Sequence, residues 1–82
     1  MRSTGRVTVY HAADCSLCAR ALEVVSEAQA ELRFELELVD IGGDPELEER
    51  YRALLPVIEI DGEQAFTYFV DPDAFRAHLV GS

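Results

Sequence analysis

The sequence contains no lysine, and its seven basic residues are all arginines that are spread along the chain. No stretch concentrates them into a basic patch, which argues against a nucleic-acid-binding surface. The acidic residues outnumber them, and the formal net charge is −9. Such a surface favours solubility and repels anionic membranes. No apolar run approaches the roughly 20 residues that a membrane-spanning helix needs, so we expect no membrane partner.

An apolar leader segment is also missing. The N-terminal residues Met1–Arg6 are polar, so we expect no signal peptide and a cytoplasmic location. No linker, internal repeat or low-complexity tract divides the chain, so residues 1–82 are predicted to form a single domain. In the cytoplasm a disulfide is more often catalytic or transient than structural.

Cysteine is scarce, and the two that are present form the motif Cys15-Ser16-Leu17-Cys18. The motif lies where a strand-like run gives way to a helical pattern that begins at Ser16. Free N–H groups at a helix N-terminus lower the pKa of a nearby thiol, which favours Cys15 as the attacking thiolate. Cys18 lies one turn further along, on the apolar face, which suits a buried resolving thiol. The pattern therefore predicts a redox-active pair.

Hydrophobic periodicity and turn residues predict the element order β-α-β-α-β-β-α. The first β-α-β unit should be parallel and right-handed, and Asp61-Gly62 predicts a hairpin between the last two strands. We therefore expect an α/β fold in which helices cover both faces of a four-stranded mixed sheet. The predicted strands are Arg6–His11, Arg33–Ile41, Val57–Ile60 and Glu63–Phe69, and the predicted helices are Ser16–Leu32, Asp44 to about Ala53, and a last one that begins at Asp71-Pro72.

This order, with a Cys-x-x-Cys motif after the first strand and Pro56 just before the third, resembles the glutaredoxin branch of the thioredoxin fold. The motif Cys15-Ser16-Leu17-Cys18 is similar to that of the glutaredoxin-like family whose active site reads Cys-x-Leu-Cys. The segments Val9-Tyr10, Val39-Asp40-Ile41 and Leu55-Pro56-Val57 also resemble that family. The resemblance covers nearly the whole chain.

The resemblance implies roles for individual residues. Cys15 would be the nucleophile and Cys18 the resolving thiol, with no cofactor beyond the Cys15–Cys18 disulfide itself. Pro56 would be a cis-proline that faces the cysteines. The backbone of Leu55, Pro56 and Val57 would offer strand-like hydrogen bonds to a substrate.

Two departures from classical glutaredoxins make glutathione a doubtful partner. Ala12 stands where these proteins carry a basic residue, three positions before the first cysteine. Phe66-Thr67 fall where a Gly-Gly turn would hold glutathione. A protein disulfide or a thioredoxin-type reductant is the expected partner, and a monomer is the expected state.

Three residues beside the cysteines have open alternatives. Asp14 either raises the pKa of the Cys15 thiol or serves as an N-cap or turn residue, and the second role is the commoner one. His11 either stabilises the thiolate as a cation or is an ordinary solvated loop residue. Leu17 should point outward, as an apolar contact for a substrate or as a lone surface leucine.

Two rival functions remain. The two cysteines with His11 and His78 could supply four zinc ligands, but the histidines lack the usual spacing, so no metal site is expected. His78 is better explained as a partly buried packing residue or as a charge at the end of the last helix. The other rival is a binding or adaptor domain of the same fold whose cysteine pair is vestigial, since fold alone does not decide function.

Overall fold

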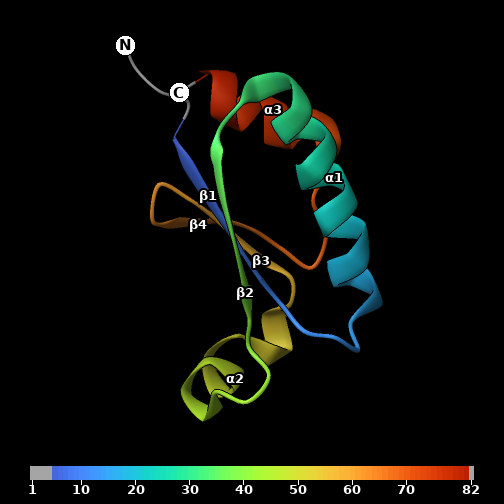
Figure 1. The fold of residues 1–82 in the computed structure, drawn as a ribbon, viewed down its shortest axis with the longest axis vertical. Coiled ribbons are helices and arrows are strands. Elements are labelled where there is room, and N and C mark those ends of the chain that lie inside the picture. The colour runs from blue at the N-terminus through green and yellow to red at the C-terminus, as the bar shows by residue number, and fades with distance from the viewer. Residues whose placement is uncertain (1–4, 82) are drawn as a thin grey trace.

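The computed structural model describes residues 5–81 and has the predicted element order (Figure 1). The prediction about a leader segment falls mainly on residues 1–4, which lie outside the described residues. Between residues 5 and 81 no helix is long and apolar enough to cross a membrane. The strands are β1 (Arg6–His11), β2 (Glu35–Asp40), β3 (Val57–Ile60) and β4 (Glu63–Thr67), and the helices are α1 (Ser16–Leu32), α2 (Pro45–Tyr51), the short 3-10 helix η1 (Arg52–Leu54) and α3 (Pro72–Gly81).

The four strands form one mixed sheet in the order β2-β1-β3-β4. β1 and β2 are parallel, in a register that runs from Arg6 opposite Glu35 to His11 opposite Asp40. β3 is antiparallel to both β1 and β4. The predicted parallel unit and hairpin are therefore confirmed. The register also places β2, with its exposed Glu35 and Glu37, at an edge of the sheet, where charged side chains discourage pairing with another chain.

Local sequence signals explain where the elements begin and end. Asp44 caps α2, because its Oδ1 accepts hydrogen bonds from the amides of Glu46 and Leu47 at 3.1 and 3.2 Å. The hairpin turn has φ 55° at Asp61 and 86° at Gly62, and positive values at both positions are typical of a type I′ turn. The second predicted helix is α-helical only to Tyr51 and continues as η1. β2 is shorter than predicted at both ends, and β4 ends at Thr67 instead of Phe69.

The main core lies between one face of the sheet and helices α1 and α3 (Figure 1). At its centre Phe75 of α3 is fully buried, and its ring centroid lies 5.8 Å from that of Phe34 and 6.1 Å from that of Phe66. The buried members of the main core are Val7, Val9, Ala21, Val25, Ala28, Phe34, Ile58, Ile60, Val70, Phe75 and Leu79.

A second, smaller cluster of buried residues lies around the cysteine motif and α2, and it is called the site-side cluster here. Tyr10 and Val57 alternate with the core residues Val9 and Ile58 along their strands, so they point to the opposite face of the sheet. There they meet Tyr51 of α2, which confirms that helices pack on both faces. The buried members of the site-side cluster are Ala12, Cys18, Ile41, Tyr51, Leu55 and Val57, and Tyr10, Cys15, Leu47 and Leu54 pack against them.

Candidate active site

The two cysteines lie at the first turn of α1 and are joined as a disulfide, with their Cα atoms 5.2 Å apart. Cys15 is the N-cap of α1, with extended backbone, and its Sγ accepts a hydrogen bond from the amide of Cys18 at 3.2 Å. Cys15 is partly exposed, whereas Cys18 is 1% exposed. Cys18 is therefore the more buried of the two cysteines, as predicted.

The segment Leu55-Pro56-Val57 packs beside the cysteines, as the resemblance implied. The Leu55–Pro56 peptide bond is cis. Leu55 and Val57 belong to the same buried cluster as Cys18. Val57 pairs with Tyr10 on one side and with Thr67 on the other, so it is an interior position of the sheet. Leu55, at 7% exposed, and the fully buried Pro56 lie at the entry to β3, and the backbone contacts with a substrate implied for Leu55, Pro56 and Val57 stay a prediction.

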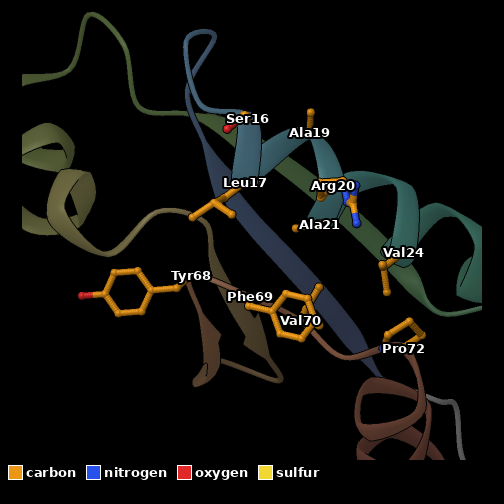
Figure 2. Close-up of a pocket in the computed structure, with 10 residues that line it drawn as sticks. All are labelled: Ser16, Leu17, Ala19, Arg20, Ala21, Val24, Tyr68, Phe69, Val70 and Pro72. Atoms are coloured by element: carbon orange, nitrogen blue, oxygen red, sulfur yellow. The ribbon is translucent and has the colours of Figure 1, made fainter.

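A groove of about 580 Å³ opens beside the motif, between the first half of α1 and the segment from Tyr68 to Pro72. Figure 2 shows Leu17 extending from α1 toward this segment, with Phe69 and Val70 along the opposite wall. The walls are mostly apolar, and Arg20 is the charged side chain among them. The residues that line the groove are Ser16, Leu17, Ala19, Arg20, Ala21, Val24, Tyr68, Phe69, Val70 and Pro72.

Three large apolar side chains at the groove remain open to solvent. Leu17 is 46% exposed, as predicted for a residue that points away from the core, and Tyr68 and Phe69 are 49% and 65% exposed. Tyr68 has φ 64°, a left-handed conformation that costs a non-glycine residue about 1 kcal/mol. Its amide is bonded to the carbonyls of Leu54 and Pro56 at 3.3 and 3.1 Å. These bonds hold the exposed aromatic pair beside the cis-proline.

Asp14 does not cap α1, because Cys15 occupies the N-cap position and Asp14 lies in the preceding turn. Its carboxylate instead pairs with Arg52 of η1, whose Nη1 lies 3.4 Å from Asp14 Oδ1. The same guanidinium donates from Nη2 to Glu48 Oε1 at 3.0 Å. Hydrogen bonding to Glu48, and to a smaller extent the charge of Asp14, raises the pKa of Arg52.

The two histidines lie on different elements. His11 ends β1, where its carbonyl accepts a hydrogen bond from the amide of Ile41 at 2.9 Å. His78 is in the last turn of α3 and is exposed, with its ring 6.1 Å from that of Phe66, so the prediction of a partly buried residue was wrong while the helix-end position is confirmed. Within residues 5–81 no three His, Cys, Asp or Glu side chains gather in a way that could hold a metal ion.

Two stacked tyrosines extend the site-side cluster beneath the motif. The rings of Tyr10 and Tyr51 lie 4.2 Å apart, and their hydroxyls donate to the two carboxylate oxygens of Glu59 at 3.5 and 3.3 Å. Burial, then the hydrogen bond with Tyr51 and the charge of Glu59, raises the pKa of Tyr10 to about 12. This network anchors α2 on the sheet, and with it the η1 segment that carries Arg52.

The sequence reasoning missed the groove wall and Arg52 as parts of the site. Tyr68 and Phe69 were assigned to the end of the last strand, although they stand shortly before the helix start at Asp71-Pro72, where an exposed connection is common. The pairing of Arg52 with Asp14 spans 38 positions in the sequence and has no local signal.

Comparison with known proteins agrees with this geometry. Residues 6–80 match the family model of the glutaredoxin-like domain (DUF836). The uncharacterized protein Rv0508 of Mycobacterium tuberculosis is 29% identical over 85 aligned positions, which cover 98% of this chain and 88% of that protein.

Solved structures show the same fold. The target protein XcR50 from X. campestris superposes with a TM-score of 0.76 at 29% identity, covering 93% of this chain and 97% of that one. Protein Ne2328 from Nitrosomonas europaea gives a TM-score of 0.77 at 26% identity, covering 95% and 94%. A thioredoxin from Halobacterium salinarum shares the fold at 20% identity, with a TM-score of 0.68 and coverage of 96% and 74%. The chain belongs to the glutaredoxin-like family and has a thioredoxin-like fold.

Proposed function

We propose that this member of the glutaredoxin-like family is a dithiol oxidoreductase that exchanges electrons with disulfides in other proteins. The observation that carries the proposal is the unequal exposure of the pair. Cys15 at the helix N-terminus is partly exposed, while Cys18, one turn further along, is buried. A two-step exchange needs this asymmetry, since one thiol must meet the substrate and the other must wait.

In the first step the Cys15 thiolate attacks one sulfur of a substrate disulfide. A Cys15–substrate disulfide forms, and the other substrate sulfur leaves as a thiolate and takes up a proton. In the second step Cys18 loses its proton and attacks Cys15 Sγ. The Cys15–Cys18 disulfide forms and the second substrate sulfur is released as a thiol. The pair thus gives up two electrons and the Cys18 proton, and the second proton that the substrate takes up comes from solvent. A thioredoxin-type reductant of matching chemistry restores the reduced pair.

The groove supports a protein as substrate. Its exposed apolar side chains, Leu17, Tyr68 and Phe69, adjoin the motif and would be covered by an extended apolar segment next to the substrate cysteine. Two positions at which classical glutaredoxins bind glutathione, a small anion, carry other residues in this chain. Ala12 is buried where a basic residue would bind it, and Phe66-Thr67 continue β4 in place of a glycine turn. We propose a monomer that works in the cytoplasm without a bound cofactor.

Trapping tests the proposal. A Cys18→Ser variant should hold a mixed disulfide with its substrate, because the second step is blocked, and mass spectrometry identifies the partner bound to Cys15. The Cys15→Ser variant is the matched control and should trap nothing. A reduced wild-type protein that fails to reduce insulin disulfides, together with no trapped species, would favour an adaptor domain that uses the groove alone.

A further inference from the structure

The guanidinium of Arg52 bridges the loop before the nucleophile and the helix before the cis-proline. It contacts Asp14 Oδ1 at 3.4 Å through Nη1 and Glu48 Oε1 at 3.0 Å through Nη2. A planar guanidinium can donate hydrogen bonds to two carboxylates at once from different nitrogens. A lysine ammonium has a single nitrogen and is less suited to this. Asp14 and Arg52 are 38 positions apart, so the contact is a product of the fold.

Asp14 presents an electrostatic problem for the proposed chemistry. It immediately precedes Cys15, and a carboxylate next to a thiol disfavours the thiolate by like-charge repulsion. The helix N-terminus acts in the opposite direction. The side chain of Asp14 is 81% exposed, and its negative charge acts on the thiol unless a positive charge compensates it. The structure supplies that compensation from η1.

We propose that Arg52 is a positioning residue that neutralises Asp14 and thereby keeps Cys15 reactive as a thiolate. The inference rests on the proposed role of Cys15 as the attacking thiol. Arg52 sits in η1, directly before Leu55 and Pro56, so the same segment supplies the cis-proline and the compensating charge. Glu48 fixes the other side of the guanidinium and thus holds it in place for Asp14.

Three other charged or titratable groups lie on elements next to the motif. His11 at the end of β1, Arg20 in α1 and Tyr68 at the groove are carried by the elements that meet at Cys15. The Arg52–Asp14 pair is itself exposed, with 46% of the Arg52 side chain open to solvent. Salt therefore screens it, and we expect a change in the thiol midpoint below about one pH unit.

The pH dependence of Cys15 alkylation tests this inference without any substrate. Reduced protein in a Cys18→Ser background is labelled with iodoacetamide between pH 4 and 10 at low ionic strength, and the midpoint of the rate profile reports the thiolate. Arg52→Gln should raise the midpoint by about half a pH unit, which lowers the labelling rate at neutral pH by up to about threefold. Asp14→Asn should lower the midpoint, and Asp14→Asn/Arg52→Gln should return it close to the parent value.

Two further variants complete the design. Arg52→Lys keeps the positive charge and should stay nearer the parent than Arg52→Gln. Arg6→Gln removes the same charge from another exposed ion pair, Arg6–Glu35, whose Nε–Oε1 distance is 3.5 Å, and should leave the midpoint unchanged. The inference would be overturned if Arg52→Gln left the midpoint unmoved, or if the double variant kept the full Arg52→Gln shift. It would also be overturned if Arg6→Gln or Arg52→Lys shifted the midpoint as much as Arg52→Gln does. Because labelling needs no turnover, the result stands apart from whether the protein reduces disulfides.

Discussion

Cys15 Sγ accepts a hydrogen bond from the amide of Cys18 at 3.2 Å, so the first cysteine of the motif is also the N-cap of its helix. The sulfur that satisfies a free amide is thus the same sulfur that we propose as the nucleophile. A thiolate is a better acceptor than a thiol, so the capping bond also favours the charged form.

The capping role predicts that two substitutions of Cys15 differ in stability. In a Cys18→Ser background, Cys15→Ser keeps a good N-cap, whereas Cys15→Ala loses the acceptor and should lower the free energy of unfolding by about 1 kcal/mol relative to serine. Chemical denaturation monitored by circular dichroism measures the difference. Equal stabilities would mean that the sulfur does not contribute as a cap.

The burial difference predicts unequal alkylation of the reduced protein. Cys15 should react with iodoacetamide much faster than Cys18 at neutral pH, because Cys18 is 1% exposed. Peptide mass spectrometry after short labelling times separates the two sites. Unfolded protein is the control and should label both at similar rates, and preferential labelling of Cys18 in the folded protein would reverse the assigned roles.

The groove predicts a selective effect of Leu17→Ser. Loss of an apolar contact worth about 1 kcal/mol should lower kcat/KM for reduction of a protein disulfide by about fivefold. It should leave the rate with a small aromatic disulfide nearly unchanged. Leu38→Ser is the matched control, because Leu38 of β2 is 52% exposed but does not line the groove. An equal loss of kcat/KM in both variants would show that the groove does not bind the substrate.

Glutathione-coupled turnover is expected to be negligible. The neutral, buried Ala12 and the strand residues Phe66-Thr67 offer no cationic or amide pocket for its carboxylates. The measurement compares reduction of the Cys15–Cys18 disulfide by glutathione with reduction by a thioredoxin system. Efficient glutathione turnover at millimolar concentration would show that Arg20 or Arg52 serves as the anion site instead.

The raised pKa of Tyr10 predicts that the free energy of unfolding falls at high pH. Its pKa is raised from 10.0 to about 12, so the folded state holds the phenolic proton more tightly than the unfolded chain. The contribution to stability is fully present below pH 10 and is lost as the pH rises toward 12. Tyr10→Phe should therefore flatten the fall of unfolding free energy across this interval. Parallel curves for the two proteins would contradict this account.

Local patterns were sufficient for most of the fold. The alternation of β1, the apolar stripe of α1 and the Asp61-Gly62 turn depend on neighbours in sequence, and all three predictions were confirmed. Leu38 shows the limit of such patterns. It alternates with Phe34 and Leu36 as a core residue would, yet it is 52% exposed, because β2 is an edge strand with a partner on one side only.

Local patterns predicted the site only where its parts are adjacent in sequence, and the family resemblance added the cis-proline. Cys15, Leu17 and Cys18 follow from the motif and the helical period, and the cis-proline follows from the family resemblance and is confirmed. The groove wall was not predictable, because the segment from Tyr68 to Pro72 reaches the side of α1 only after β4 has turned back along β3. Contacts of this kind depend on the register of the whole sheet, which no local pattern encodes.

The separation between the main core and the site-side cluster has a consequence for how such a protein can evolve. The main core contains neither cysteine, and none of its buried members comes from the loop before α1 or from η1. Substitutions at Asp14, Leu17 or Arg52 should therefore cost little folding free energy. Under the proposed function, residues beside the reactive cysteine can change while the scaffold that carries them stays the same.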